Sequence, residues 1–570
     1  MHIGISAYFH DSSIALIDNQ GNLVDFKKEE WLSRVKGDKS FPRMALNDVL
    51  DANQLDASMI ESITFYEKPL RAWLTILKYS VRNNSLRNEL TRNYFKNIWK
   101  SSIIFRYDLM KHLSDATMPI FYSDHYLSHT LSGLFYAEQG SYAAIVADGF
   151  GDSDCSAIHH VRSTTDIRTV WASPYPNSLG LFYSAITDYL GFLVNEGEYK
   201  VMGLASYGAP IFLEELKKTL NFYDDQLIVD TSYYDYTRSV EQSFSEKLVT
   251  LLKTPARKSN VHLDLDSPNF QKYADIAASA QKLVEDLLIE IFQHAHNITG
   301  ERKFIFTGGV AMNSVALEKL SKCAFIDEII VPPSPGDSGA AIGAAYYGYL
   351  KETKNLQKQE KFRLTENLFP GKVDQNEDFF TLKLKKISEP EDAIEKVAEL
   401  ISQNEVIATA YGDIETGPRA LGHRSMICNA HSEETIQFLN TVIKSRSKFR
   451  PTAPVILESN AKKYFNISEK IESCYIHMGA VTTPLDEVVE SIKGVVHVDG
   501  TCRIQICDES QLLGKILKEL SKKDIFVIAN TSFNISSDPM VYSKEDALLS
   551  IERMQIKYLL TENGLYERSS

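Results

Sequence analysis

Residues 303–320 read KFIFTGGVAMNSVALEKL, and this stretch does most to define the expected fold. The apolar run KFIFT is followed by two glycines and then by apolar residues at helical spacing. This pattern predicts a strand, a tight turn and a helix. Glycines at such a turn let backbone amides approach a phosphate or an adenosine closely, and neighbouring amide side chains add donors.

Two similar junctions lie earlier in the chain, HDSS at 10–13 and DGFGD at 148–152, and both follow predicted strands. One such turn would be weak evidence, because glycine turns are common in proteins. Three of them in this order favour an α/β protein with an actin-like ATPase fold, in which two βββαβα lobes hold a nucleotide between hairpin turns. The sequence has no GxxxxGK[ST] motif, which excludes a P-loop.

The composition is that of a soluble globular chain of 570 residues, which is long enough for several domains. No apolar run approaches the ~20 residues of a membrane span, and the start of the chain does not resemble a signal peptide. Six scattered cysteines without a CxxC pair indicate a reduced, cytoplasmic protein without a structural zinc site. We therefore expect no membrane partner.

The net charge of −14 argues against nucleic-acid binding. Residues 68–111 run the other way, with ten Lys and Arg against two acidic residues. Pro69 and the apolar spacing after it predict a helical insertion. We favour a solvated basic face over a surface for an anionic partner, because charge runs usually face solvent. The insertion is also a candidate interface for a homodimer.

Residues 351–365 are polar and highly charged, and we place a linker there between domains 1–350 and 366–570. The second domain begins as another α/β unit. EDAIEKVAELISQNE reads as a helix, and VIATAYGD and FVIANTSFN read as strands.

Residues 123–140, SDHYLSHTLSGLFYAEQG, predict a helix that Ser123 or Asp124 caps and that Gly140 ends. His125 and His129 lie on one stripe, roughly opposite a stripe of leucines. Two readings are open. The histidines are exposed or bonded to nearby backbone, or they present two nitrogens to one metal ion. Tyr126 stands where a zincin protease has glutamate, which excludes that class.

A metal site needs a third ligand, and Asp337 in PPSPGDSGAAIGAA is the best candidate. Its position at a helix start also suits a simple N-cap. Two histidines and one carboxylate with open positions suit Fe(II), with Zn or Mn as alternatives.

The second domain has a concentration of cationic and amide side chains beside its turns. Cations at turns suit phosphate binding better than cations along an exposed helix face. The side chains are Arg419, Arg424, Lys444, Arg446, Arg450, His497, Arg503, Asn530, Ser532 and Asn534.

Taken together, the motifs resemble those of the NodU/CmcH O-carbamoyltransferases. The similar stretches include HDSSIALI, EEWLSRVKGDKSFP, HYLSH, DGFGD, EGEYKVMGLASYG, GGVAMN, PGDSGAAIGAA, GPRALGHRS, KFRPTAPVIL, HVDGTCRIQ and NTSFN, and the resemblance runs from about residue 2 to about residue 560. It implies an N-terminal TsaD-like domain with the actin-like fold and a C-terminal YrdC-like domain. Lys444 and Arg446 look like the KxR element of YrdC-like proteins, and Ser532 and Asn534 look like their SxN element.

The resemblance implies two reactions. In the second domain, carbamoyl phosphate and ATP, with Mg²⁺, give carbamoyl adenylate and pyrophosphate. In the first domain, a hydroxyl of a small-molecule or glycan acceptor takes the carbamoyl group and AMP leaves. The family's metal, expected to be Fe(II), would sit on His125, His129 and Asp337, and His10 is the expected base. The adenylate pocket would be lined by Ser12, Asp148, Gly149, Lys200, Gly308, Gly309 and Asn313.

Three residues depart from the family pattern. Trp31 stands where arginine is usual, Gly37 where histidine is frequent, and His423 where asparagine is usual. The first two put acceptor or nucleotide contacts near the N-terminal hairpins in doubt.

Three alternative functions fit the sequence less well. Threonylcarbamoyl modification of tRNA fits poorly with an acidic chain that fuses both domains. A HypF-like maturation enzyme would carry CxxC zinc fingers and place its YrdC-like part first. A non-catalytic ATP-binding scaffold would leave the polar set of the second domain unexplained.

Overall fold

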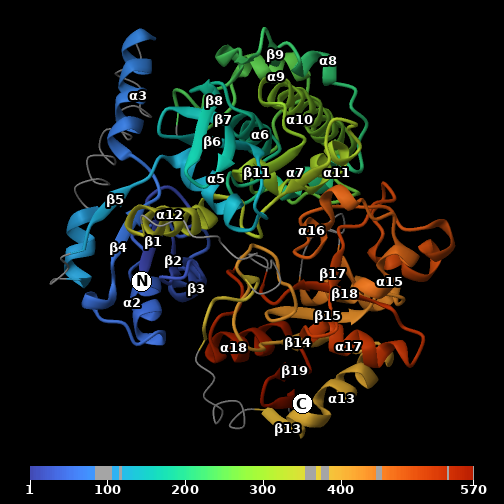
Figure 1. Ribbon diagram of the computed structural model, residues 1–570. Coiled ribbons are helices and arrows are strands. Elements are labelled where there is room, and N and C mark those ends of the chain that lie inside the picture. The colour runs from blue at the N-terminus through green and yellow to red at the C-terminus, as the bar shows by residue number, and fades with distance from the viewer. Residues whose placement is uncertain are drawn as a thin grey trace. The chain divides into compact units, whose positions relative to one another are not determined.

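A computed structural model describes residues 1–83, 105–113, 118–239, 241–353, 367–373, 384–444, 452–535 and 538–568 (Figure 1). The protein is a mixed α/β protein, as predicted, and divides into two compact units. Unit 1 comprises Met1–Glu29 and Gly37–Arg363, and unit 2 comprises Glu30–Lys36 and Leu364–Ser570. Among the described helices, none is both long and apolar enough to cross a membrane.

Unit 1 contains two five-stranded sheets with the same strand order. The first sheet is ordered β3-β2-β1-β4-β5, and the second β8-β7-β6-β11-β12. In each, the first three strands form an antiparallel meander and the last two run parallel to its opening strand. The strands are β1 (His2–Ser6), β2 (Ser13–Ile17), β3 (Leu23–Lys28), β4 (Ser62–Phe65), β5 (Ile120–Tyr122), β6 (Tyr142–Gly151), β7 (Asp154–Ser163), β8 (Asp166–Pro174), β11 (Lys303–Thr307) and β12 (Glu328–Ile330). The chain therefore repeats a topology without repeating a sequence.

Two helices pack together in the middle of unit 1 (Figure 1). Helix α12 (Asp337–Glu352) covers β1, β2 and β4, and α5 (His125–Phe135) packs on β6 and β11. Their close contact depends on Gly343, where a Cβ atom would lie 1.8 Å from the carbonyl oxygen of Ser128. Glycine at this position therefore brings the start of α12 toward the histidine-bearing helix.

The described part of unit 1 contains further helices besides these two. They are α2 (Arg43–Ala52), α3 (Pro69–Arg82), α6 (Leu179–Tyr189), α7 (Glu198–Ala205), α8 (Leu213–Leu216), α9 (Glu246–Leu252), α10 (Phe270–Thr299) and α11 (Ser314–Ser321), with a small hairpin of β9 (Leu220–Tyr223) and β10 (Gln226–Val229). The predicted basic insertion begins with α3, while residues 84–104 of it lie outside the described part of the chain.

Unit 2 is built on one eight-stranded mixed sheet with the order β13-β20-β19-β14-β15-β18-β16-β17. Its strands are β13 (Leu384–Ser388), β14 (Ile407–Thr409), β15 (Ser425–Asn429), β16 (Ala453–Leu457), β17 (Gln505–Cys507), β18 (Val527–Ser532), β19 (Tyr558–Thr561) and β20 (Gly564–Arg568). Its helices are α13 (Pro390–Ser402), α14 (Glu433–Phe438), α15 (Glu458–Tyr464), α16 (Glu472–Tyr475), α17 (Leu512–Ser521) and α18 (Lys544–Met554). Apolar residues of α13, α17 and the sheet form one buried core.

One short piece of the N-terminal region belongs to unit 2. The chain leaves β3, forms α1 (Glu29–Ser33) and returns to unit 1 at Gly37. Both ends of this excursion bond to the backbone of Ser12, whose carbonyl accepts from Glu29 (2.9 Å) and whose amide donates to Asp38 (2.8 Å). Trp31 within it is 1% exposed and stacks on Tyr542 at 6.2 Å between ring centroids. No pattern in the sequence indicated this placement.

Candidate functional site

Helix α5 holds both histidines in the interior of unit 1. Asp124 caps it by accepting from the amide of Tyr126, and the helix ends at Phe135, before the predicted end at Gly140. His125 is 1% exposed and His129 is fully buried, which excludes solvent exposure as the reading of this motif. The other part of that reading, a bond to backbone, is present at Nδ1 of His129.

Two carboxylates face the histidines. Nε2 of His129 lies 3.2 Å from Oδ1 of Asp337, at the start of α12, and 3.3 Å from Oδ2 of Asp148, near the end of β6. Nε2 of His125 lies 3.9 Å from Oδ1 of Asp337 and 3.5 Å from Oδ2 of Asp148. One nitrogen or oxygen from each of the four residues lies within 4.8 Å of the others.

The chemistry of these four side chains fits a divalent cation. Nδ1 of His129 donates to the carbonyl oxygen of Pro335 at 3.1 Å, so Nε2 is the nitrogen that faces Asp148 and Asp337. It becomes a metal ligand once it gives up the proton that it shares with these carboxylates. Both ring nitrogens of His125 and Oδ2 of Asp148 are buried without a hydrogen bond. Such groups are rarely left unpaired, and two imidazoles with two carboxylates are a common ligand set for Fe(II), Mn or Zn.

The charges within the cluster oppose the cost of burial. Burial raises the pKa of Asp148, but the imidazoles of His125 and His129 hold it well below its usual range. Burial lowers the pKa of His129, yet Asp148 and Asp337 raise it to about 9. A metal bound here has to displace a proton from this group of side chains.

Asp337 faces two groups at once. Its Oδ1 points to the histidines, while its Oδ2 lies 3.5 Å from Nε2 of His10 and accepts from the hydroxyl of Tyr66 at 3.5 Å. Gly336, and not Asp337, is the N-cap of α12, so the simple capping role is wrong for Asp337.

His10 lies between two acids, with Nδ1 at 3.0 Å from Oδ2 of Asp11. Burial lowers the pKa of His10, and Asp337 and Asp11 together raise it to about 10. A cation on Asp337 would oppose that rise, because it competes for the same carboxylate charge.

Residues predicted to line an adenylate pocket fall into two groups. Asp148, Gly149, Gly308 and Gly309 lie together, since Asp148 accepts from the amide of Gly149 (2.7 Å) and a Cβ atom at Gly309 would lie 3.1 Å from Asp148. Gly308 has a φ of +89°, and a Cβ atom there would lie 2.2 Å from the carbonyl oxygen of Ala147.

No hydrogen bond or ion pair within the described residues joins the other three residues of that prediction to Asp148. Asn313 exchanges two amide hydrogen bonds of 3.0 Å with Gln281 and also caps α11. Lys200 on α7 lies 5.7 Å from the ring of Phe192, and no contact within the described chain joins it to Asp148. The hydroxyl of Ser12 is buried without a hydrogen bond, in the turn that also holds His10.

A second polar cluster forms in unit 2. The ammonium of Lys444 donates to the carbonyl oxygens of Ser532 (2.8 Å) and Asn534 (2.6 Å) and to Oδ1 of Asn534 (2.8 Å). The hydroxyl of Ser532 donates to the same Oδ1 at 2.6 Å. The structure thus joins the first residue of the KxR element to the SxN element, while Arg446 and Arg450 lie outside the described residues.

Other predicted residues of unit 2 organise its loops. Arg424 donates to the carbonyl oxygens of Tyr411, Gly412 and His423. Asn530 donates to the carbonyl oxygen of Ala420 and to Gln505. Arg419 and Arg503 are partly exposed, and burial together with the charge of Arg503 lowers the pKa of His497 to about 4. These bonds hold the loops in place, while Nε of Arg424 and Oδ1 of Asn530 are buried without a hydrogen bond.

Sequence reasoning missed Glu415 and Phe369, which shape this region. Oε1 of the buried Glu415 accepts from the amides of Leu421, His423 and Arg424, which folds the GPRALGHRS loop around one carboxylate. His423 stacks on Phe369 at 3.8 Å between ring centroids. An acid followed by Thr-Gly-Pro was the available signal for Glu415.

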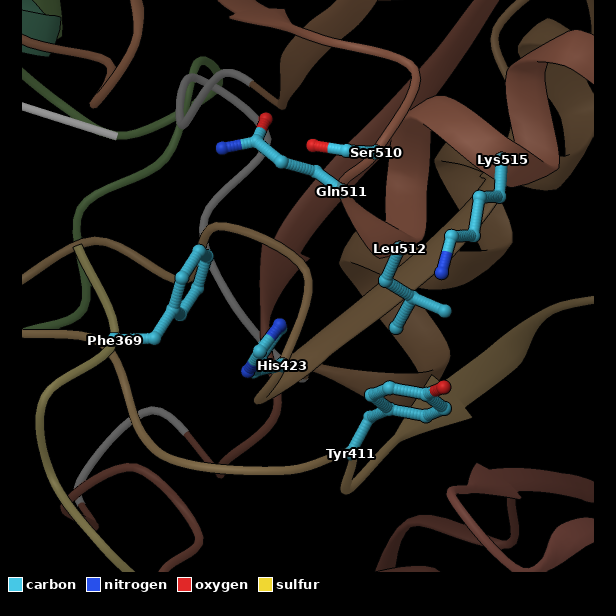
Figure 2. Close-up of a pocket in the computed structure, with 7 residues that line it drawn as sticks. All are labelled: Phe369, Tyr411, His423, Ser510, Gln511, Leu512 and Lys515. Atoms are coloured by element: carbon cyan, nitrogen blue, oxygen red, sulfur yellow. The ribbon is translucent and has the colours of Figure 1, made fainter. Parts of the chain in front are cut away.

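A pocket of about 270 Å³ opens beside that loop (Figure 2). The figure shows His423 in its centre, between Phe369 on one side and Leu512 on the other, with Tyr411 below. It is lined by Phe369, Tyr411, His423, Ser510, Gln511, Leu512 and Lys515. Because Arg424 follows His423 directly and its carbonyl accepts from Phe533, the loop links this pocket to the SxN element.

Comparisons with known proteins agree over nearly the whole chain. Residues 1–346 match the family model "Carbamoyltransferase N-terminus", and residues 398–568 match "Carbamoyltransferase C-terminus". An uncharacterised protein of Synechocystis sp. is 30% identical over 100% of this chain and 97% of its own length. Nodulation protein NolNO of Sinorhizobium fredii is 27% identical over 99% of this chain and 80% of its own.

Solved structures are more distant. Component A of (R)-2-hydroxyglutaryl-CoA dehydratase from Acidaminococcus fermentans is 16% identical, covers 61% of this chain and 98% of its own, and gives a TM-score of 0.32, which is too low to define a fold. The two family models are therefore the informative matches. They show that the chain belongs to the carbamoyltransferase family and is a transferase enzyme.

Proposed function

We propose that the protein is an ATP-dependent O-carbamoyltransferase that forms carbamoyl adenylate in unit 2 and uses it in unit 1. The observation that carries the proposal is the buried cluster of His125, His129, Asp148 and Asp337 inside a unit that matches a carbamoyltransferase model. The Lys444, Ser532 and Asn534 cluster supports the second half, because it groups a cation with hydroxyl and amide donors in a second family-matched unit.

The folds proposed for the two units follow from their topology and motifs. The repeated strand order of unit 1 supports an actin-like ATPase domain similar to TsaD proteins. The contact between Lys444 and the SxN element supports a YrdC-like unit 2.

The first proposed reaction forms carbamoyl adenylate in unit 2. Water cleaves carbamoyl phosphate to carbamate and phosphate. A carbamate oxygen then attacks the α-phosphorus of ATP, the bond to the β-phosphate oxygen breaks, and pyrophosphate leaves from carbamoyl adenylate. Lys444 supplies positive charge where the phosphates gain negative charge, and Ser532 and Asn534 orient it.

In the second reaction an acceptor hydroxyl attacks the carbamoyl carbon, and AMP leaves with the bonding electron pair. The hydroxyl proton passes to Nε2 of neutral His10, which the contact with Asp11 orients. This role requires that the pKa of His10 fall from about 10, as it does when a cation competes for the charge of Asp337. A metal held by His125, His129, Asp148 and Asp337, proposed to be Fe(II), would supply a Lewis acid for the developing negative charge. Gly308 lets the backbone approach the nucleotide closely.

The proposed acceptor is a hydroxyl of a small molecule or glycan and not a nucleic acid. We further propose that the protein acts in the cytoplasm, uses Mg²⁺ with ATP in unit 2, and forms a homodimer.

The proposal is tested without the acceptor. Protein given ATP, Mg²⁺ and carbamoyl phosphate should release pyrophosphate, and Lys444→Ala should abolish the release. Lys462→Ala, which removes an exposed lysine paired with Glu469, is the matched control and should leave it unchanged. No pyrophosphate from the wild-type protein, with Fe(II) supplied under reducing conditions, would rule the proposal out.

A further inference from the structure

Arg34 lies in the N-terminal excursion but is bound to a C-terminal segment of unit 2. Its Nη1 donates to the carbonyl oxygen of Met540 (2.7 Å), its Nη2 to that of Pro539 (3.1 Å), and its Nε lies 3.2 Å from Oδ1 of Asp546. One planar guanidinium thus holds two consecutive carbonyls and a carboxylate, an arrangement that lysine cannot reproduce.

The segment that Arg34 holds also anchors the SxN element. Nδ2 of Asn534 donates to the carbonyl oxygen of Asp538 at 2.6 Å, one residue before the first carbonyl bound by Arg34. The amide of Val541 donates to the carbonyl oxygen of Phe533 at 3.1 Å. These two bonds join residues 533–534 to residues 538–541, and Oδ1 of Asn534 in turn accepts from the ammonium of Lys444.

Packing around Arg34 limits its freedom. Trp31 stacks on Tyr542 with ring planes 11° apart, and Asp546 also forms the capping box of α18 with Ser543. The stacked rings and the capping box thus hold the chain on either side of the Arg34 contacts, including the carboxylate of Asp546.

We infer that Arg34 is a positioning residue for the Lys444, Ser532 and Asn534 site, acting through residues 538–546. The inference rests on the proposed function for its chemical readout. Without the guanidinium, Pro539 and Met540 lose donors, the carbonyl of Asp538 shifts, and Asn534 no longer fixes the ammonium of Lys444. A small displacement of such a group costs on the order of 10²-fold in rate.

The test compares Arg34→Ala with Arg553→Ala. Arg553 lies 3.5 Å from the carboxylate of Asp538 at the surface, so its removal takes away a guanidinium near the same residue but leaves the carbonyl contacts intact. We expect Arg34→Ala to lower kcat for pyrophosphate release on the order of 10²-fold, and Arg553→Ala to leave it unchanged. Added ethylguanidinium should restore activity to Arg34→Ala, which a loss of folded protein would not allow.

Hydrogen exchange separates this inference from the proposed function. In Arg34→Ala, amides of residues 532–535 and 538–546 should exchange faster, while those of β6 and α12 in unit 1 stay unchanged. If the wild-type protein releases no pyrophosphate, the proposed function fails, and exchange alone decides the role of Arg34. Unchanged exchange in residues 532–535 and 538–546, or unchanged kcat in an active protein, overturns the inference.

Discussion

The carboxylate of Asp148 belongs to the candidate metal site. Sequence reasoning placed it beside a nucleotide, but its Oδ2 lies 3.3–3.5 Å from both histidines and has no hydrogen bond. The carboxylate adds negative charge to a set that otherwise has one carboxylate and two neutral imidazoles. This negative charge should raise the affinity of the site for any divalent cation.

We therefore predict that Asp148→Asn lowers metal affinity. The loss should reach at least the roughly 10–100-fold seen when an outer partner of a metal ligand is removed. Metal retained after dialysis against graded chelator, measured by mass spectrometry, checks this. Asp154→Asn, in the next strand and outside the cluster, is the control. Equal retention by both variants would contradict a ligand role.

His159 gives a prediction for pH. It is 3% exposed, its Nδ1 lies 2.7 Å from the hydroxyl of Thr130, and burial lowers its pKa to about 4. Between pH 6.5 and 4 the unfolded chain binds a proton here and the folded chain does not. Stability therefore falls as pH falls through that window, by about 3 kcal/mol for a shift of this size.

His159→Gln keeps a hydrogen-bonding group and removes the titration. Urea unfolding between pH 4 and 6.5 should show a smaller loss of stability for this variant than for wild type. His160→Gln, which removes a partly exposed neighbour paired with Glu301, should keep the wild-type slope. Parallel curves for wild type and His159→Gln would show that His159 does not cause the loss.

At the scale of elements, the candidate metal site depends on the contact of α5 with α12. His125 and His129 come from the first helix and Asp337 from the second, and Gly343 sets their separation. We predict that Gly343→Ala pushes the helices apart and costs about 1–3 kcal/mol of unfolding free energy. It should also weaken metal binding, because the ligands separate.

Gly140→Ala is the matched control. Gly140 is exposed after α5, and the atoms nearest to a Cβ atom there would belong to the Tyr142 side chain, none closer than 3.3 Å. Its stability should stay within about 0.5 kcal/mol of wild type. Denaturant unfolding of both variants measures the difference, and an equal cost would show that helix contact is not limiting.

The same elements show what local sequence can reveal. The spacing of His125 and His129 lies within one helix, so periodicity alone put them on one face. The strand, turn and helix around Gly308 were also predicted from a local pattern. The structure confirms them as β11, a turn with positive φ at Gly308, and α11. Asp148 and Asp337 are 189 residues apart in the sequence, and only the fold brings them together.

For the whole molecule, the proposed division of labour predicts two separable losses. His129→Ala should keep pyrophosphate release, since it leaves the Lys444 cluster intact, but should stop carbamoyl transfer to the acceptor. Lys444→Ala should stop both, because no adenylate forms. Parallel assays of pyrophosphate and carbamoylated product check this, and equal loss of both activities in His129→Ala would contradict the division.

The excursion of residues 30–36 also has a consequence for biosynthesis. Arg34 and its partner carbonyl at Met540 are 506 residues apart in the sequence. At translation rates of about 5–20 residues per second, the ribosome needs roughly 25–100 s to make the intervening chain. Trp31 therefore has no contact with Tyr542 until the ribosome has made the intervening chain. Unit 2 therefore includes a segment that is made long before the rest of it, and it completes its folding only when residues 30–36 pack against residues 538–546.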